Sequence, residues 1–160
     1  MKIVFVGLSN KINKMPFDIT TNSGKIVHEI ISRLKDDCYL MNLVDYAPLD
    51  ENLRLRYPTE QEIIDCTQKF KKKIKKINPD LIVSFGNITT NHLKKLNLTI
   101  TAHGKTAGEI LAVIEDVKDQ MDTFSSKKCD YLITILNDDT VYALIERASG
   151  SSECNVISKI

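Results

Sequence analysis

The sequence predicts an α/β fold, specifically a three-layer α/β/α sandwich around a central, mainly parallel sheet of four strands. Two observations carry this prediction. Four short apolar runs are each bounded by polar or turn residues, as in strands that are buried on both faces of a parallel sheet. Between these runs the apolar residues recur at helical spacing. Strands and helices that alternate at these lengths favour right-handed crossovers within a single domain over residues 1–160.

The four predicted strands cover residues 2–6, 38–44, 80–85 and 130–136. Helices are predicted at residues 23–34, 59–78, 89–96, 107–121 and 140–148, and residues 155–160 form either a terminal strand or a frayed tail. The second helix has the clearest start, because Thr59 and Glu62 can form a capping box that satisfies two backbone amides. It ends before Pro79, because proline disfavours the helical conformation in the residue that precedes it.

The composition limits the classes of function. The chain has 22 lysines and arginines against 21 aspartates and glutamates, and its net charge of +1 is not that of a polybasic nucleic-acid binder. Any contact with nucleic acid is therefore expected to be local. No run approaches the roughly 18–20 apolar residues that a membrane span needs, and the amino terminus enters a strand-like run at once. We therefore expect a cytoplasmic protein that does not bind a membrane, and we favour a monomer.

Polar and small side chains follow each of the predicted strands. The loops at these strand ends begin at Gly7, Asn42, Gly86 and Asn137. In open α/β sheets, ligands bind outside the carboxyl ends of the strands. Polar residues at all four ends therefore predict a ligand site at this edge of the sheet.

An ordered series of motifs runs through residues 1–96. The first strand, Ile3-Val4-Phe5-Val6-Gly7, is followed by Pro16-Phe17 and by Thr21-Asn22-Ser23-Gly24 at the start of a helix. The second strand ends in Asn42 and is followed by Pro48, Arg56 and Pro58-Thr59-Glu60-Gln61-Glu62. The third motif is Pro79-Asp80-Leu81-Ile82-Val83-Ser84-Phe85-Gly86. In this order, the motifs resemble those of the uracil-DNA glycosylase superfamily.

The resemblance implies a pocket for a base extruded from DNA, because such enzymes take the base out of the stack before they cut its glycosidic bond. Phe17 would stack on the base, and Asn42 would read its edge, since an amide offers both a donor and an acceptor. Gly7, Gly86 and His103 are the other substrate-binding candidates, His103 because the turn after it could bind an anion. Phe17 could instead be a core aromatic residue, and Asn42 an Asx-turn residue.

The catalytic candidates are Ser9, Asn10 and Asn137. Members of the superfamily carry an acid or an asparagine in the first loop, where it positions the hydrolytic water. Here Leu8 and Ser9 stand in those places, and Asn10 follows. Asn137 stands where the superfamily has a late His-Pro-Ser motif. The plainer alternatives are that Ser9 and Asn10 only form a loop, and that Asn137 caps the helix predicted at residues 140–148.

We predict no metal and no cofactor. The resemblance extends to a branch of the superfamily that holds an iron-sulfur cluster, and Cys66 matches the place of one ligand of that cluster. However, Tyr46 occupies the expected position of another ligand, and such a cluster needs four thiolates. The four cysteines of the chain are scattered and include no C-x-x-C pair, as in the reduced thiols of a cytosolic protein.

Three functions are compatible with these features. The leading hypothesis is hydrolysis of the N-glycosidic bond of uracil or a modified base in DNA. The second is a base- or nucleotide-binding module without catalysis, which the missing His-Pro-Ser motif and the acidic residues in its place favour. The third is hydrolysis of free nucleotides, which the small and charge-balanced chain favours. The expected partner is therefore DNA, a nucleobase or a nucleotide.

Overall fold

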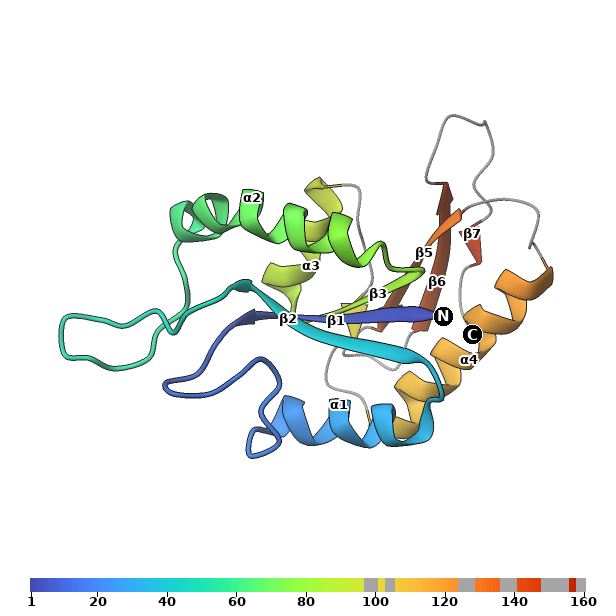
Figure 1. Ribbon diagram of the computed structural model, residues 1–160, viewed down its shortest axis with the longest axis horizontal. Coiled ribbons are helices and arrows are strands. Elements are labelled where there is room, and N and C mark those ends of the chain that lie inside the picture. Colours follow the sequence, from blue (N-terminus) through green and yellow to red (C-terminus); the bar gives the residue numbers. More distant parts are fainter. Residues whose placement is uncertain (97–100, 103–105, 124–128, 136–140, 148–155, 158–160) are drawn as a thin grey trace.

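A computed structural model describes residues 1–96, 101–102, 106–123, 129–135, 141–147 and 156–157 of the chain (Figure 1). The strands are β1 (Lys2–Ser9), β2 (Asp37–Val44), β3 (Leu81–Phe85), β4 (Thr101–Ala102), β5 (Cys129–Ile135), β6 (Val141–Arg147) and β7 (Val156–Ile157). The helices are α1 (Asn22–Arg33), α2 (Glu60–Ile77), α3 (Asn87–Lys95) and α4 (Ala107–Thr123). None of the helices in these ranges is long and apolar enough to cross a membrane.

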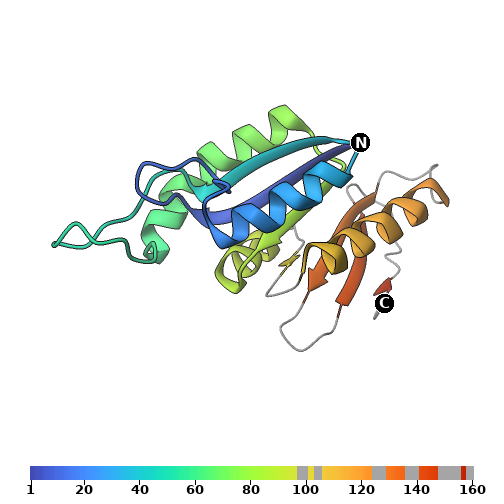
Figure 2. The ribbon, with the colours of Figure 1, turned by 90° about the horizontal axis from the view of Figure 1, so that it is seen from below.

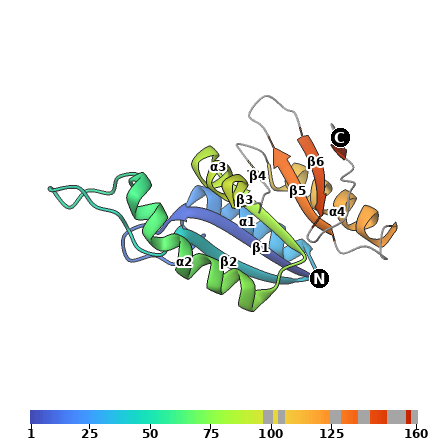
Figure 3. The ribbon, with the colours of Figure 1, turned by 90° about the horizontal axis from the view of Figure 1, so that it is seen from above.

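The strands form one sheet in the order β2-β1-β3-β4-β5-β6-β7 (Figure 3). The pairings from β2 across to β5 are parallel, whereas β6 and β7 are added in antiparallel pairings. β1 lies second from one edge of the sheet, with Val4 opposite Tyr39 of β2 on one side and Ile82 of β3 on the other. The first strand of the chain is thus paired along both edges.

Helices cover both faces of this sheet. α1 and α4 lie side by side on one face, and α2 and α3 lie on the other (Figures 1 and 2). Side chains along β1 alternate between two apolar clusters, because successive residues of a strand point to opposite faces. Ile3 and Phe5 pack with α1 and α4, whereas Val4 and Val6 pack with α2 and α3. The α/β class predicted from the sequence is confirmed.

The start of α2 follows from its sequence. The Thr59 hydroxyl accepts a hydrogen bond from the Glu62 amide (3.2 Å), and the Glu62 carboxylate accepts one from the Thr59 amide (2.7 Å). The helix ends at Ile77, and Asn78 follows in the left-handed conformation (φ 51°). The buried residues of this helix, which face the sheet, are Ile63, Phe70 and Ile74. The predicted capping box is therefore present.

Two expectations about the second half of the chain need correction. The four-stranded sheet is not confirmed, because the described sheet has seven strands. The helix expected at residues 140–148 is wrong, since Val141–Arg147 is β6, with Leu144 opposite Leu132 of β5. Valine, tyrosine and isoleucine favour strands, and the edge of β5 offers backbone groups that a helix would leave unpaired. Asn137, taken as a possible cap of that helix, lies outside the described residues.

Candidate functional site

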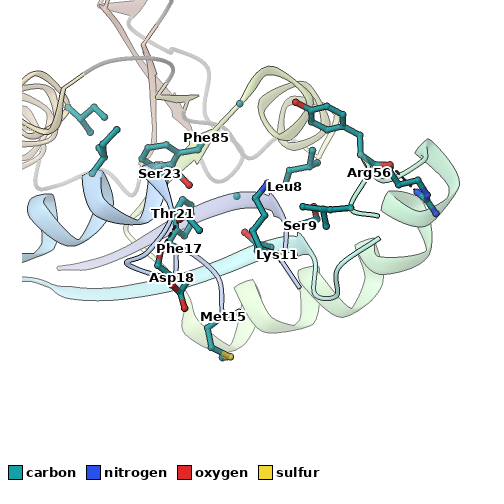
Figure 4. A pocket seen from close by; sticks show the side chains of 17 residues that line it. Leu8, Ser9, Lys11, Met15, Phe17, Asp18, Thr21, Ser23, Arg56 and Phe85 are labelled. Atoms are coloured by element: carbon teal, nitrogen blue, oxygen red, sulfur yellow. Dashed lines mark hydrogen bonds between the residues drawn. The ribbon is translucent and has the colours of Figure 1, made fainter. Parts of the chain in front are cut away.

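A pocket of about 530 Å³ opens at the carboxyl ends of β1 and β3. The connections from β1 lead to β2 on one side and later to β3 on the other, so the pocket lies at the point where the strand order reverses. Its walls come from the loop after β1, the start of α1, the end of β3 and the segment before α2 (Figure 4). Of the residues proposed from the sequence, the pocket brings together Gly7, Ser9, Phe17, Asn42 and Gly86.

Phe17 forms an aromatic wall together with Phe85. The two ring centroids are 5.2 Å apart, with the rings at 66° to each other. Phe17 is only 7% exposed, and its φ of 52° is unusual for a bulky residue. Its carbonyl oxygen lies 3.1 Å from Nε2 of His28 on α1. Backbone strain of this kind persists where the surroundings hold it, and it is found mostly at binding sites.

Gly7 is the point at which Phe17 and Asn42 approach the backbone. A Cβ atom added to Gly7 would lie 2.3 Å from Oδ1 of Asn42 and 3.2 Å from Cζ of Phe17. The first distance is too short for any side chain at this position and the second is tight, so glycine leaves room for the amide and the ring where they now lie. The base-binding candidates Phe17 and Asn42 are therefore adjacent, as the sequence predicted for one pocket.

Asn42 belongs to a chain of hydrogen-bonded amides. Its Nδ2 donates to Oδ1 of Asn10 (2.7 Å), and Nδ2 of Asn10 donates to the carbonyl oxygen of Asp45 (3.1 Å). The backbone amide of Asn10 also donates to the carbonyl oxygen of Tyr46 (3.2 Å). Asn42 is 8% exposed, so these bonds hold its side chain in one place at the wall of the pocket. Both ends of the Asn10 amide are engaged.

The other candidates in the loop after β1 differ in their surroundings. Leu8 is half-buried and packs against the apolar cluster under α2, although it also contributes to the pocket wall. Ser9 is half-buried, pairs with Val44 in the sheet and lines the pocket. Ser9 therefore offers a hydroxyl to a bound ligand at the end of β1. Asn137 and His103 lie outside the described residues.

Gly86 connects β3 to α3 at the edge of the pocket. It has a φ of 93°, which only glycine adopts readily, and it is the N-cap residue of α3. Its carbonyl oxygen accepts hydrogen bonds from the backbone amide (3.0 Å) and the hydroxyl (2.9 Å) of Thr90. This turn places Phe85, which precedes Gly86, beside Phe17.

The rim of the pocket carries residues that the sequence did not single out. Met15 and Tyr57 are each 76% exposed, and both line the opening. Lys11 lines it as well and makes no ion pair within the described part of the chain. Phe85 could have been found from its place at the end of the third strand. Met15 and Tyr57 stand in loops without a periodic pattern, and no signal in the sequence marks them.

Arg56 anchors the segment between β2 and α2, which extends beyond the end of the sheet (Figure 1). Its guanidinium group donates to both carboxylate oxygens of Glu62, at 2.7 Å and 2.9 Å. It also donates to the carbonyl oxygens of Leu49 and Tyr57, each at 3.0 Å. The guanidinium is thus occupied by protein partners, and it shapes the pocket wall rather than offering a vacant charge to a phosphate.

The Arg56–Glu62 pair predicts a specific pH dependence. The hydrogen bonds from Arg56 lower the pKa of Glu62 from its usual 4.5 to about 2. A carboxylate with a lowered pKa in the folded state adds stability that is complete above pH 4.5 and is lost as the pH falls towards 2. Glu62→Gln should therefore melt below the wild type at pH 7, and the gap should narrow below pH 4.5.

Thermal melts of both proteins from pH 7 to pH 2.5 test this expectation. Glu51→Gln, at an exposed position of the same segment, controls for the loss of one negative charge. A gap between Glu62→Gln and the wild type that stays constant down to pH 2.5 would contradict the assignment.

The surroundings of Cys66 do not fit an iron-sulfur cluster. Cys66 packs among the apolar side chains between α2 and the sheet, and Cys38 packs on the opposite face of the sheet. These two thiols therefore cannot bind the same iron-sulfur cluster. Burial raises the pKa of the Cys66 thiol, which disfavours the thiolate that a metal needs. In the described ranges, no three histidine, cysteine or acidic side chains form a group that could hold a metal ion.

The fold and the pocket define a class of protein. The three-layer α/β/α sandwich has a pocket at the point where the strand order of its sheet reverses. The pocket has an aromatic wall and one buried side-chain amide, which suit a flat ligand with polar edges. The sequence profile of the uracil DNA glycosylase superfamily matches residues 1–140. The chain belongs to this superfamily, and the resemblance seen in its motifs is confirmed.

A curated relative extends this comparison. The chain is 30% identical over 106 residues to a type-4 uracil-DNA glycosylase from Saccharolobus solfataricus, strain P2. The aligned region is 66% of this chain but only 43% of the relative, so the chain spans less than half the length of that protein.

Proposed function

We propose that this chain takes a base extruded from DNA into the pocket between Phe17 and Asn42 and hydrolyses its N-glycosidic bond. One observation carries the proposal: Phe17 and Asn42 converge on one point above Gly7. An aromatic face and an amide edge at that point are the two contacts that a flat base with polar edges requires. The family and the type-4 relative support the same function.

The proposed reaction uses few groups of the protein. Water adds to C1′ of the sugar, the bond from C1′ to the base nitrogen breaks, and the departing base takes the proton of the water. Stacking on Phe17 holds the base, and the hydroxyl of Ser9 orients the water from the pocket wall. The base is read by Asn42, whose place is fixed by its bond to Asn10.

The test is base excision from oligonucleotides. Purified protein is incubated with single- and double-stranded DNA that contains one uracil, and the products are treated with alkali to cut abasic sites. Asn42→Ala should lower excision at least about fivefold, since a lost hydrogen bond to a buried polar group costs about 1–3 kcal/mol. Asn52→Ala, at an exposed position outside the pocket, should excise as the wild type does. Intact strands with the wild type would overturn the proposed hydrolysis.

A second function, base binding without hydrolysis, is favoured by two observations in the first loop. Leu8 stands where the resemblance expects a water-positioning group, and both amide atoms of Asn10 are already bonded within the protein. This function predicts saturable binding of a uracil-containing strand with no abasic product. Nucleoside monophosphates, analysed in parallel by chromatography, distinguish a hydrolase of free nucleotides, because only that activity would release base from them.

A further inference from the structure

We propose that Asn10 is a positioning residue that fixes the orientation of the Asn42 amide, with its oxygen turned towards the pocket. The site then takes bases whose facing edge offers an N–H donor. This inference rests on the proposed function for the identity of the ligand. The orientation of the amide itself can be tested on the free protein.

The orientation of Asn10 follows from its first partner. The carbonyl oxygen of Asp45 can only accept a hydrogen bond, and it lies 3.1 Å from the Asn10 side chain. The Asn10 amide must therefore turn its NH₂ group towards Asp45. Its backbone is held at the same time, because the Asn10 amide N–H donates to the carbonyl oxygen of Tyr46 (3.2 Å). The Asn10 oxygen must then face the other way, towards Asn42.

The orientation of Asn42 follows in turn. The Asn10 oxygen accepts from Nδ2 of Asn42 at 2.7 Å. If Asn42 were flipped, two amide oxygens would face each other at that distance, which is repulsive. The backbone carbonyl of Asp45 thus fixes the orientation of the Asn10 amide, and the Asn10 amide in turn fixes the positions of the oxygen and nitrogen of the Asn42 amide.

The Asn42 oxygen lies on the side of the pocket. A Cβ on Gly7 would be 2.3 Å from this oxygen and 3.2 Å from Cζ of Phe17, so the oxygen and the edge of the Phe17 ring both lie beside Gly7 in the pocket lining. Among the described residues, no donor is paired with this oxygen. Asn42 is 8% exposed as a residue and lines the pocket, so its unpaired oxygen favours a ligand that brings its own donor.

The chemistry of the ligand follows from that acceptor. Uracil and related imide bases carry an N–H between two carbonyl groups and can donate to the Asn42 oxygen. Cytosine has a ring nitrogen acceptor at the corresponding place, which would face the oxygen without a proton. A site that was built to bond one edge rejects the other because its polar group is left unpaired.

Binding of single-stranded oligonucleotides that carry 2′-fluoro-deoxyuridine or 2′-fluoro-deoxycytidine, which resist hydrolysis, tests the inference. In Asn10→Ala the Asn42 amide is free to flip, so the preference for uracil over cytosine should fall by roughly five- to tenfold. Asn10→Asp still accepts from Asn42 and should keep the preference within about threefold of the wild type. It should also melt at a lower temperature, because its carboxylate faces the carbonyl oxygen of Asp45.

That combination separates a positioning role from a merely structural one. If Asn10 had only a structural role, the preference for uracil over cytosine would fall whenever the melting temperature fell. Asn10→Asp would then lose both the preference and the thermal stability. Equal loss of affinity for both probes in Asn10→Ala would also overturn the inference and would leave the proposed function standing.

Side-chain amide NMR of the free protein gives a readout that needs no ligand. The Asn42 NH₂ protons should exchange slowly with solvent in the wild type and in Asn10→Asp, and at least tenfold faster in Asn10→Ala. Fast exchange in the wild type would overturn the amide chain. A wild type that shows slow exchange but binds neither probe would overturn the proposed function, and the preference for N–H edges with it.

Discussion

Gly24→Ala is expected to destabilise the protein by about 3 kcal/mol, the upper part of the usual range for overpacking. A Cβ on Gly24 would lie 1.9 Å from the carbonyl oxygen of Asp18 and 2.7 Å from that of Phe17. Both atoms belong to the backbone, so no side-chain rotation can relieve the contact. The loop that carries Phe17 would have to leave the start of α1, and the Thr21 hydroxyl bond to the Gly24 amide (3.0 Å) would break.

Gly108→Ala is the matched control, because Gly108 is also a glycine near the start of a helix. Among the described residues outside its own helix backbone, a Cβ on Gly108 would meet no atom within 4 Å. Alanine there should stabilise the protein by about 0.5–1 kcal/mol, since glycine loses more backbone freedom on folding. Urea unfolding of the three proteins measures both effects. Similar stabilities for Gly24→Ala and Gly108→Ala would show that a Cβ at position 24 does not clash with the backbone of Asp18.

Phe17→Leu is expected to weaken binding of a uracil-containing strand by about fivefold or more, since stacking of a base on an aromatic ring is worth about 1–3 kcal/mol. Leucine keeps an apolar side chain but has no π-face to offer the base. It also loses the contact with the Phe85 ring at 5.2 Å. Fluorescence anisotropy with a 2′-fluoro-deoxyuridine oligonucleotide measures the affinity.

Phe70→Leu is the control for a general loss of packing. Phe70 is 2% exposed and lies on the buried side of α2, on the face of the sheet opposite Phe17. This variant should lose about 1–2 kcal/mol of stability, because the smaller side chain leaves part of the buried space unfilled, and it should bind the strand as the wild type does. If both variants lost the same affinity, Phe17 would be a core residue without a role in stacking.

Local patterns predicted the first half of the fold well. The capping box of Thr59 and Glu62 needs only residues three positions apart, and it marked the start of α2 correctly. The apolar stripe of α1 depends on helical spacing alone, and Val27 and Ile30 are buried as expected. These features depend on neighbours in the sequence, so tertiary context did not alter them.

Pairing partners decided the elements that were mispredicted. Val141–Arg147 has a spacing compatible with a helix, but the backbone of β5 is available beside it and makes it a strand. The site shows the same limit. Phe17 and Asn42 could be recognised from motifs, whereas the bond from Asn42 to Asn10 joins residues 32 positions apart and has no signature in the sequence. Arg56 stood out as a charge, and its pairing with Glu62 became visible only in three dimensions.

The place of β1 between β2 and β3 has a consequence for how the protein folds. The amide of Lys2 donates to the side chain of Asp80 at 2.8 Å, across 78 residues of chain. β1 precedes β3 in the chain, so its edge towards β3 stays unpaired until β3 has been synthesised. Pairings between such distant segments form late and slowly, because the intervening chain must be closed into a loop. The pocket lies between the ends of these two strands, so it forms only after this slow pairing is complete.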